Sequence, residues 1–94
     1  MATSRANGQL GTTAATILSG STSDSKVQVS CVNTGVVAET VILTVTRAGG
    51  TARQIRRAIL QAKESLIVSG IGLESGDAIL GVTTTASVVD YDVT

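Results

Sequence analysis

β-Branched side chains dominate this chain of 94 residues, which contains 14 threonines and 12 valines but no proline, histidine, tryptophan or phenylalanine. Branching at Cβ restricts χ1 and suits the pleated surface of a sheet, so this feature predicts strands rather than helices. Histidine is the side chain used most often as a general acid or base and as a metal ligand. Its absence argues against an enzyme, and we expect no catalytic residue, metal site or cofactor.

A single domain is expected at this length. Its core must be built from valine, isoleucine, leucine and alanine, because Tyr91 is the only aromatic residue. Aromatic rings usually supply much of the buried area in a small core. We therefore expect a partner subunit to supply part of the burial, and a thin aliphatic sandwich that is sufficient by itself is the alternative.

The seven basic and seven acidic residues cancel, but they are segregated along the chain. Five bases and no acid lie between residues 40 and 63, whereas five acids and no base lie between residues 64 and 94. Such a split could pair copies of the chain around a ring, or the two regions could neutralise each other inside one fold. Zero net charge argues against a nucleic-acid-binding protein, which needs a basic footprint.

One cysteine, Cys31, cannot form an internal disulfide. The N-terminus lacks the apolar core of a signal sequence, so folding in a reducing compartment is expected. No apolar run approaches the roughly 18 residues needed to span a bilayer, which predicts a soluble protein without a membrane partner. Cys31 shares a face with Val27 and Val29, which favours a small buried hydrophobe over a reactive thiol.

Alternation of apolar and polar residues predicts six to eight short strands separated by Gly/Ser/Asn turns. The strands expected outside the contested middle are 10–18, 26–33, 40–47, 78–85 and 88–93. Gly81 interrupts one of them and is expected to mark a bulge or the close approach of another backbone. The pattern as a whole predicts an all-β fold, either an antiparallel sandwich or a jelly-roll-like barrel.

Residues 1–9 are small and polar, and we expect them to form a flexible N-terminal arm ahead of one domain over residues 10–94. Strand alternation also predicts which side chains form the core of that domain. The residues expected to be buried are Val27, Val29, Cys31, Val41, Leu43, Val45, Leu73, Ile79, Val89, Tyr91 and Val93.

Residues 51–67 are compatible with two structures. Apolar residues recur there at intervals of three, four or one, as on the buried face of an amphipathic helix. They are Ile55, Ala58, Ile59, Ala62 and Leu66. The same segment can instead form strands over 53–60 and 65–69 with a tight turn between them. The β character of the rest of the chain favours the strands, and a short helix within 51–67 is the alternative.

Three features follow one another in the first half of the chain: a strand ending at Asn33-Thr34-Gly35, a threonine-rich strand over 39–47, and a turn at Gly49-Gly50. In the second half, a turn and strand over 62–70 precede a Leu-x-x-Gly-Asp-x-Ile element, which consists of Leu73, Gly76, Asp77 and Ile79. This series resembles the small β-sandwich virion proteins of tailed bacteriophages, above all capsid decoration or cement proteins. The resemblance covers residues 10–94 and departs from the family in the serine-rich turn over 19–25.

The resemblance implies a virion structural protein that is assembled in the host cytoplasm. It would act as a homotrimer and stabilise the shell through contacts with the major capsid protein or another virion protein. The alternative within the same class is a tail, neck or fibre-associated protein. The alternative from another class is a carbohydrate- or small-ligand-binding β-module, against which Tyr91 counts, because its alternation with Val89 and Val93 turns this one aromatic ring towards the core.

Three groups of charged or polar residues are candidate sites. Leu73, Gly76, Asp77 and Ile79 mark a structural turn, since glycine takes positive φ readily and aspartate bonds its own turn backbone. Arg53, Arg56 and Arg57 are a possible contact with acidic residues of a partner, and a solvated surface is the alternative. Asp90 and Asp92, with Glu74 or Asp77 nearby, could bind Ca²⁺, although keeping a sheet surface soluble explains them more simply.

Overall fold

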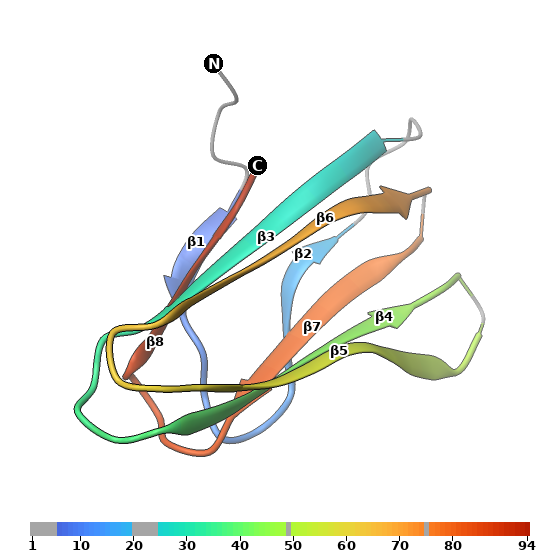
Figure 1. Ribbon diagram of the computed structural model, residues 1–94. Coiled ribbons are helices and arrows are strands. Elements are labelled where there is room, and N and C mark those ends of the chain that lie inside the picture. Colours follow the sequence, from blue (N-terminus) through green and yellow to red (C-terminus); the bar gives the residue numbers. More distant parts are fainter. Residues whose placement is uncertain (1–5, 20–24, 49, 75) are drawn as a thin grey trace.

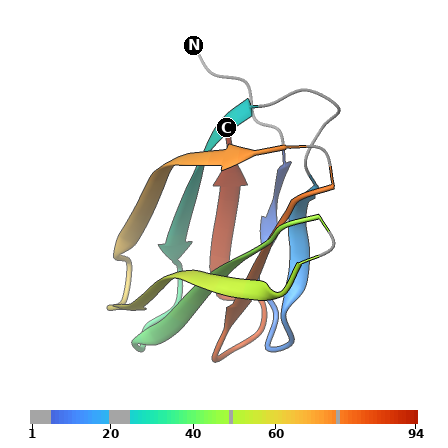
Figure 2. The same ribbon diagram turned by 90° about the vertical axis from the view of Figure 1, so that its right-hand side faces the viewer.

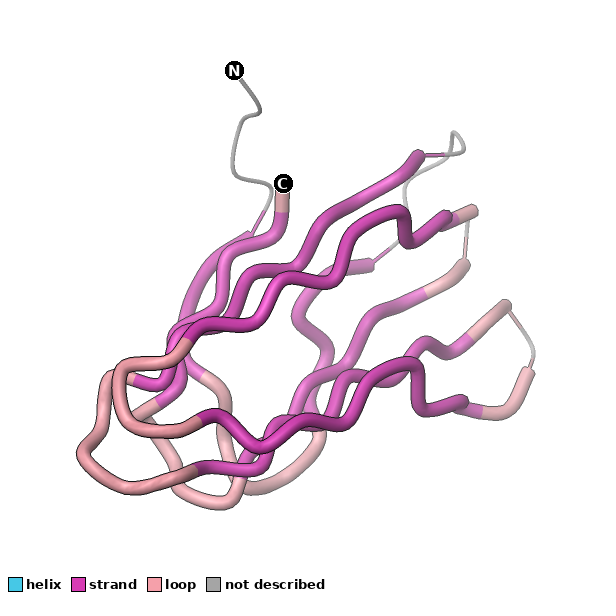
Figure 3. Tube along the Cα trace, in the orientation of Figure 1, coloured by secondary structure: helices cyan, strands magenta, loops and turns pink. Residues whose placement is uncertain are grey.

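Eight strands make up the computed structural model, which describes residues 6–19, 25–48, 50–74 and 76–94 (Figure 1). Within these ranges the chain forms no helix (Figure 3). The strands are β1 (Ala6–Gln9), β2 (Ala15–Ser19), β3 (Ser25–Asn33), β4 (Glu39–Thr46), β5 (Ala52–Leu60), β6 (Ser65–Leu73), β7 (Ala78–Thr83) and β8 (Val89–Val93). The all-β antiparallel sandwich predicted from the sequence is confirmed.

Two four-stranded sheets form the layers of the sandwich (Figures 1 and 2). Sheet A has the order β1-β8-β3-β6 and sheet B the order β2-β7-β4-β5, and all neighbouring strands are antiparallel. Only the connection between β4 and β5 joins neighbours within one sheet, and the others pass from one sheet to the other. Apart from the β4–β5 pair, each sheet is therefore held together by contacts between segments that are distant in sequence.

The contested middle of the chain is a pair of strands, so the helical alternative for residues 51–67 is wrong. β5 pairs along its length with β4, and β6 pairs with β3 in the other sheet. A β-bulge interrupts the β4–β5 ladder, and Ile55 has no partner across it. An inserted residue breaks the period of two, which explains why this segment imitates a helical spacing.

The N-terminal region differs from the expected flexible arm, because residues 6–9 form β1. This short edge strand pairs with β8, Ala6 lying opposite Val93 and Gln9 opposite Asp90. Residues 1–5 of the predicted arm, and most of the serine-rich turn over 19–25, lie outside the described residues. The first expected strand over 10–18 is also shorter, since β2 begins at Ala15.

The core lies between the sheets and is almost entirely aliphatic. Every residue predicted to be buried is buried except Tyr91, which is partly exposed and packs against the core from the β8 side. Gly81 leaves room for the Leu10 side chain rather than for a backbone or bulge, because a Cβ there would lie 2.7 Å from Leu10 Cδ2. The bulge in this part of sheet B falls on the neighbouring strand, between Thr16 and Leu18.

Candidate functional site

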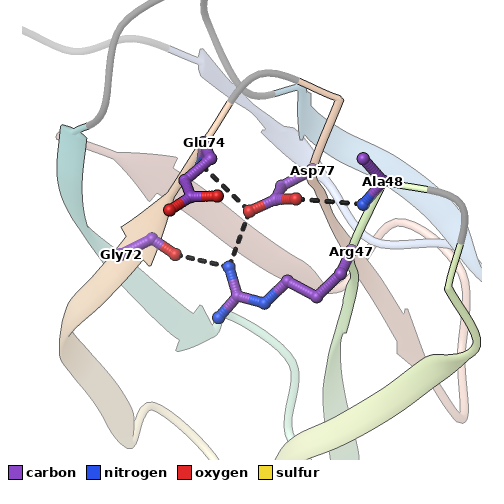
Figure 4. Close-up of polar contacts among 5 residues, drawn as sticks. All are labelled: Arg47, Ala48, Gly72, Glu74 and Asp77. Carbon is purple, nitrogen blue, oxygen red and sulfur yellow. Dashed lines mark hydrogen bonds and ion pairs between the residues drawn. The ribbon is translucent and has the colours of Figure 1, made fainter.

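The Leu-Gly-Asp-Ile element forms the connection from β6 to β7, where the chain passes from sheet A to sheet B (Figure 4). Leu73 and Ile79 are buried at its two ends, and Gly76 adopts a positive φ of 88°. The Asp77 carboxylate accepts hydrogen bonds from the Glu74 N–H, at 2.9 Å, and from the Ala48 N–H, at 3.1 Å. Asp77 thus joins its own turn to the end of β4.

Arg47 completes this cluster, and sequence reasoning had not singled it out. Its Nη1 donates to Asp77 Oδ2 and to the Gly72 carbonyl oxygen, both at 2.7 Å. One guanidinium therefore binds the end of β6 in sheet A and the start of β7 in sheet B. The Asp77 side chain is buried, at 4% exposed, whereas its partner Arg47 is 55% exposed. Both Asp77 carboxylate oxygens accept hydrogen bonds from groups of this cluster, so its role is to hold two connections together.

The protonation of Asp77 follows from this geometry. The Glu74 N–H and the Arg47 guanidinium hold the pKa of the Asp77 carboxyl below its usual value of 3.8. Both donors stabilise the charged form and outweigh the opposing effect of desolvation. Asp77 is therefore ionised throughout the neutral range, with its charge held by these donors.

At the opposite end of the sandwich, the Asn33 side chain joins three segments. Its amide nitrogen donates to the carbonyl oxygens of Val37 (2.8 Å), Leu60 (3.0 Å) and Gln61 (3.3 Å). Its oxygen accepts from the Gly35 N–H at 2.9 Å. Asn33 is fully buried. The Asn-Thr-Gly element thus supplies a buried polar centre that fixes the loop after β3 against the end of β5.

Glu39 is a buried carboxylate that sequence reasoning also missed. It begins β4 opposite Leu60, and its two oxygens accept hydrogen bonds from the hydroxyls of Thr84 (2.8 Å) and Thr85 (3.1 Å). Two threonine hydroxyls from the same end of sheet B thus supply the hydrogen bonds that this buried carboxylate needs. Alternation alone would place Glu39 on the inner face, but it could not reveal that the threonines after β7 come close to it.

The three arginines of β5 are brought together along one edge of sheet B. Arg53 and Arg56 lie opposite Val45 and Leu43, so they share the inner face of the sheet, whereas Arg57 lies opposite Ile42 on the outer face. All three side chains are exposed. None of their guanidinium groups has a hydrogen bond or an ion pair with any residue in the described ranges. We call this set the arginine edge.

Charge is divided between the two sheets as well as along the sequence. The strands of sheet B carry the arginine edge and a single acid, the buried Glu39. The strands of sheet A carry Asp90 and Asp92 with one base, Lys26. Asp90 accepts a hydrogen bond from Gln9 Nε2 at 3.1 Å. The Arg47–Asp77 ion pair joins the basic and acidic halves of the sequence, but it leaves the arginine edge uncompensated.

The outer faces of the two sheets also differ in polarity. On sheet B, Ile42 lies beside Val82, and Thr40 lies beside Ile59, whose side chain is 63% exposed. A shallow depression of about 250 Å³ opens there; it is lined by Thr40, Ile42, Arg57, Val82, Thr83 and Thr84. The outer face of sheet A instead carries mostly polar residues along β1, β3 and β8. On β6 of sheet A, Ile67 is also exposed. Sheet B nevertheless presents the more apolar surface, because Leu80 lies half-buried on its outer face beside Ile42 and Val82.

The remaining candidate residues are Cys31, Tyr91, Asp90 and Asp92. Cys31 is fully buried, and burial raises the pKa of its thiol to about 11, so it is protonated at neutral pH. The Tyr91 ring lies over Gly8, where a Cβ would be 3.2 Å from the phenolic oxygen. In the described part of the chain, no three Asp, Glu, Cys or His residues gather as a metal ion would require, so Asp90 and Asp92 form no such group with Glu74 or Asp77.

Comparison of the chain with protein-family models, with curated proteins and with solved structures gives no match. No helix in the described ranges is long and apolar enough to cross a bilayer.

Proposed function

We propose that this chain is a structural protein of a tailed-phage virion, in the first place a capsid decoration protein that strengthens the shell by binding across its subunits. The sequence resemblance of residues 10–94 supports the assignment to a virion, and the outer face of sheet B is the observation that carries the binding role. This face combines apolar side chains with threonines, next to three arginines that have no partner in the described chain. A surface of this composition suits contact with another protein, because burial of its apolar area stabilises the complex.

The fold is consistent with a mechanical role. Both ends of the sandwich are fixed by polar clusters, around Asp77 at one end and Asn33 at the other. A rigid module of this kind loses little conformational entropy when it binds. Repetition multiplies the effect, since weak contacts repeated over a homotrimer and over a shell add to a large avidity. The major capsid protein, or another virion protein, is the proposed partner, and the assembled virion is the proposed location.

A matched pair of variants tests the proposal. Ile59 on the outer face of sheet B and Ile67 on the outer face of sheet A are almost equally exposed, at 63% and 61%. The purified protein is mixed with empty shells of the phage that encodes it, and the bound fraction is measured by co-sedimentation. We expect Ile59→Gln to lower occupancy while Ile67→Gln leaves it unchanged.

Two results would count against the proposal. Equal occupancy for both variants and the native protein would show that the outer face of sheet B does not contact the shell. Binding of the native protein to purified tails but not to shells would place the chain on the tail, neck or fibre instead. Light scattering of the free protein tests the homotrimer separately, and a trimer that forms only on shells would also agree with the proposal.

A further inference from the structure

The strand that carries the arginine edge, β5, lies at the margin of sheet B. Shell binding through the outer face of sheet B would leave this margin free. β5 pairs with β4 on one side, and no strand of the described residues lies on its other side. In an antiparallel strand, alternate N–H and C=O groups point away from the paired neighbour, so β5 (Ala52–Leu60) offers main-chain donors and acceptors along its outer side. The bulge at Ile55 interrupts their spacing, and the carbonyl of Leu60 is already taken by Asn33. No proline interrupts β5.

We propose that β5 accepts an acidic, extended segment of another protein as an added strand of sheet B. Main-chain hydrogen bonds would give the affinity, and carboxylates opposite the arginine edge would give the specificity. Arg53 and Arg56 point to one face and Arg57 to the other, so the segment carries acidic residues on both faces. The exposed Ile55, between Arg53 and Arg56, and the exposed Ile59, which follows the arginines, offer apolar contacts to the same strand.

A second copy of this chain does not fit the edge. Antiparallel pairing of β5 with itself about a two-fold axis near its middle brings arginines across from arginines, which is unfavourable. The other edge strands of the sandwich are β1, β2 and β6, and none of them contains an acidic residue. The acidic strand β8 has neighbours on both sides. Among the described strands a second copy offers no acidic edge, so we assign the complementary strand to a different protein.

Arginines on an edge strand can also serve only to prevent aggregation, and the experiment must separate this role from recognition. The probe is a fluorescent synthetic peptide of about ten residues, long enough to cover β5, with threonine and valine in alternation and glutamates at the positions opposite the arginine edge. A second peptide has glutamine in place of each glutamate. Two further peptides are methylated on alternate backbone nitrogens, one in the odd and the other in the even positions.

We expect the acidic peptide to bind the native protein saturably by fluorescence anisotropy, and the glutamine peptide to bind more weakly. Only one of the two methylated peptides should lose binding, because a strand uses alternate N–H groups along one edge. Amide exchange should slow along β5. The double change Arg53→Gln and Arg57→Gln should weaken binding roughly two- to thirty-fold, since exposed ion pairs contribute little individually. Lys26→Gln on sheet A is the matched control and should have no effect.

The inference fails if the acidic peptide does not bind saturably, if the glutamine peptide binds equally well, or if both methylated peptides bind as well as the parent. It also fails if the control variant weakens binding as much as the double change. A salt titration of the native protein serves if the variant does not fold, because recognition by charge must weaken as salt rises. The test needs no shells, so its failure would leave shell binding to be decided by co-sedimentation.

Discussion

Replacement of Asn33 by alanine should be among the most damaging polar substitutions in this chain. The amide is fully buried and bonds to the carbonyl of Leu60, which is also buried, and to the N–H of Gly35. A buried polar group left without its partner costs about 1–3 kcal/mol. Loss of the partner of the buried Leu60 carbonyl accounts for most of this cost, and loss of the partner of the half-buried Gly35 N–H accounts for less. We therefore expect Asn33→Ala to lower the free energy of unfolding by about 2–5 kcal/mol.

Asn33→Asp keeps the shape of the side chain but removes the donors that bind three carbonyl oxygens. An ionised carboxylate would face the oxygens of Val37, Leu60 and Gln61, so the pKa of the introduced group is raised in the folded state. The folded protein then holds the proton more tightly than the unfolded one, whose aspartate titrates near about 3.9. The loss of stability relative to the native protein should therefore be smallest below about pH 4 and should grow as the pH rises towards the folded-state pKa.

Urea denaturation followed by far-UV circular dichroism and by the fluorescence of Tyr91 measures both variants. Gln54→Ala is the control, because Gln54 is an exposed amide on β5 with no side-chain hydrogen bond to a described residue. It should change the free energy of unfolding by less than about 0.5 kcal/mol. If Asn33→Ala lost no more than this control, or if the effect of Asn33→Asp did not depend on pH, the buried hydrogen bonds would not be what holds this end together.

Three further predictions concern the core and the turn cluster. Leu43→Ala, at a fully buried site in the middle of sheet B, should cost about 2–5 kcal/mol in urea denaturation, and a cost below about 0.5 kcal/mol would contradict the assigned core. Asp77→Asn should be less stable than the native protein at pH 7. The native advantage should disappear as the pH falls below 3.8 through the lowered folded-state pKa, and a gap that persists unchanged at pH 2 would refute the ionic contribution of Asp77. The Cys31 thiol should react with a thiol reagent at pH 7.5 only as fast as the protein unfolds, and rapid reaction of the folded protein would contradict its burial.

Local sequence patterns were sufficient to predict the strands and most of the core. Along β3 and β4 every second residue is apolar and buried, as a period of two requires: Val27, Val29 and Cys31 in one strand, and Val41, Leu43 and Val45 in the other. Around β5 the same reasoning was ambiguous, because the bulge at Ile55 shifts the alternation and produces a helix-like spacing. The β5–β4 ladder, not the local sequence of residues 51–67, decides that this segment is extended.

The polar clusters also show that local sequence does not reveal contacts between distant residues. The Leu-Gly-Asp-Ile element identified a turn, because its glycine and aspartate act on backbone within a few residues. Arg47 was not identified as its partner, since the contact with Asp77 joins residues that are 30 positions apart. Likewise Asn33 was expected to close a strand, whereas the bonds of its amide to Leu60 and Gln61 depend on the return of β5 to that end of the sandwich.

The sequence by itself determined the class of structure, the single thin aliphatic core and the absence of histidine chemistry, because composition and a period of two act over short distances. Only the tertiary structure decided which strands are neighbours and which lie at an edge. The order of the strands depends on connections that cross between the sheets and bring distant segments together. This order places the acids of β8 in the middle of sheet A and the arginines of β5 at the margin of sheet B. The surface available to a partner is therefore set by topology, while the residues that line it were already visible in the sequence.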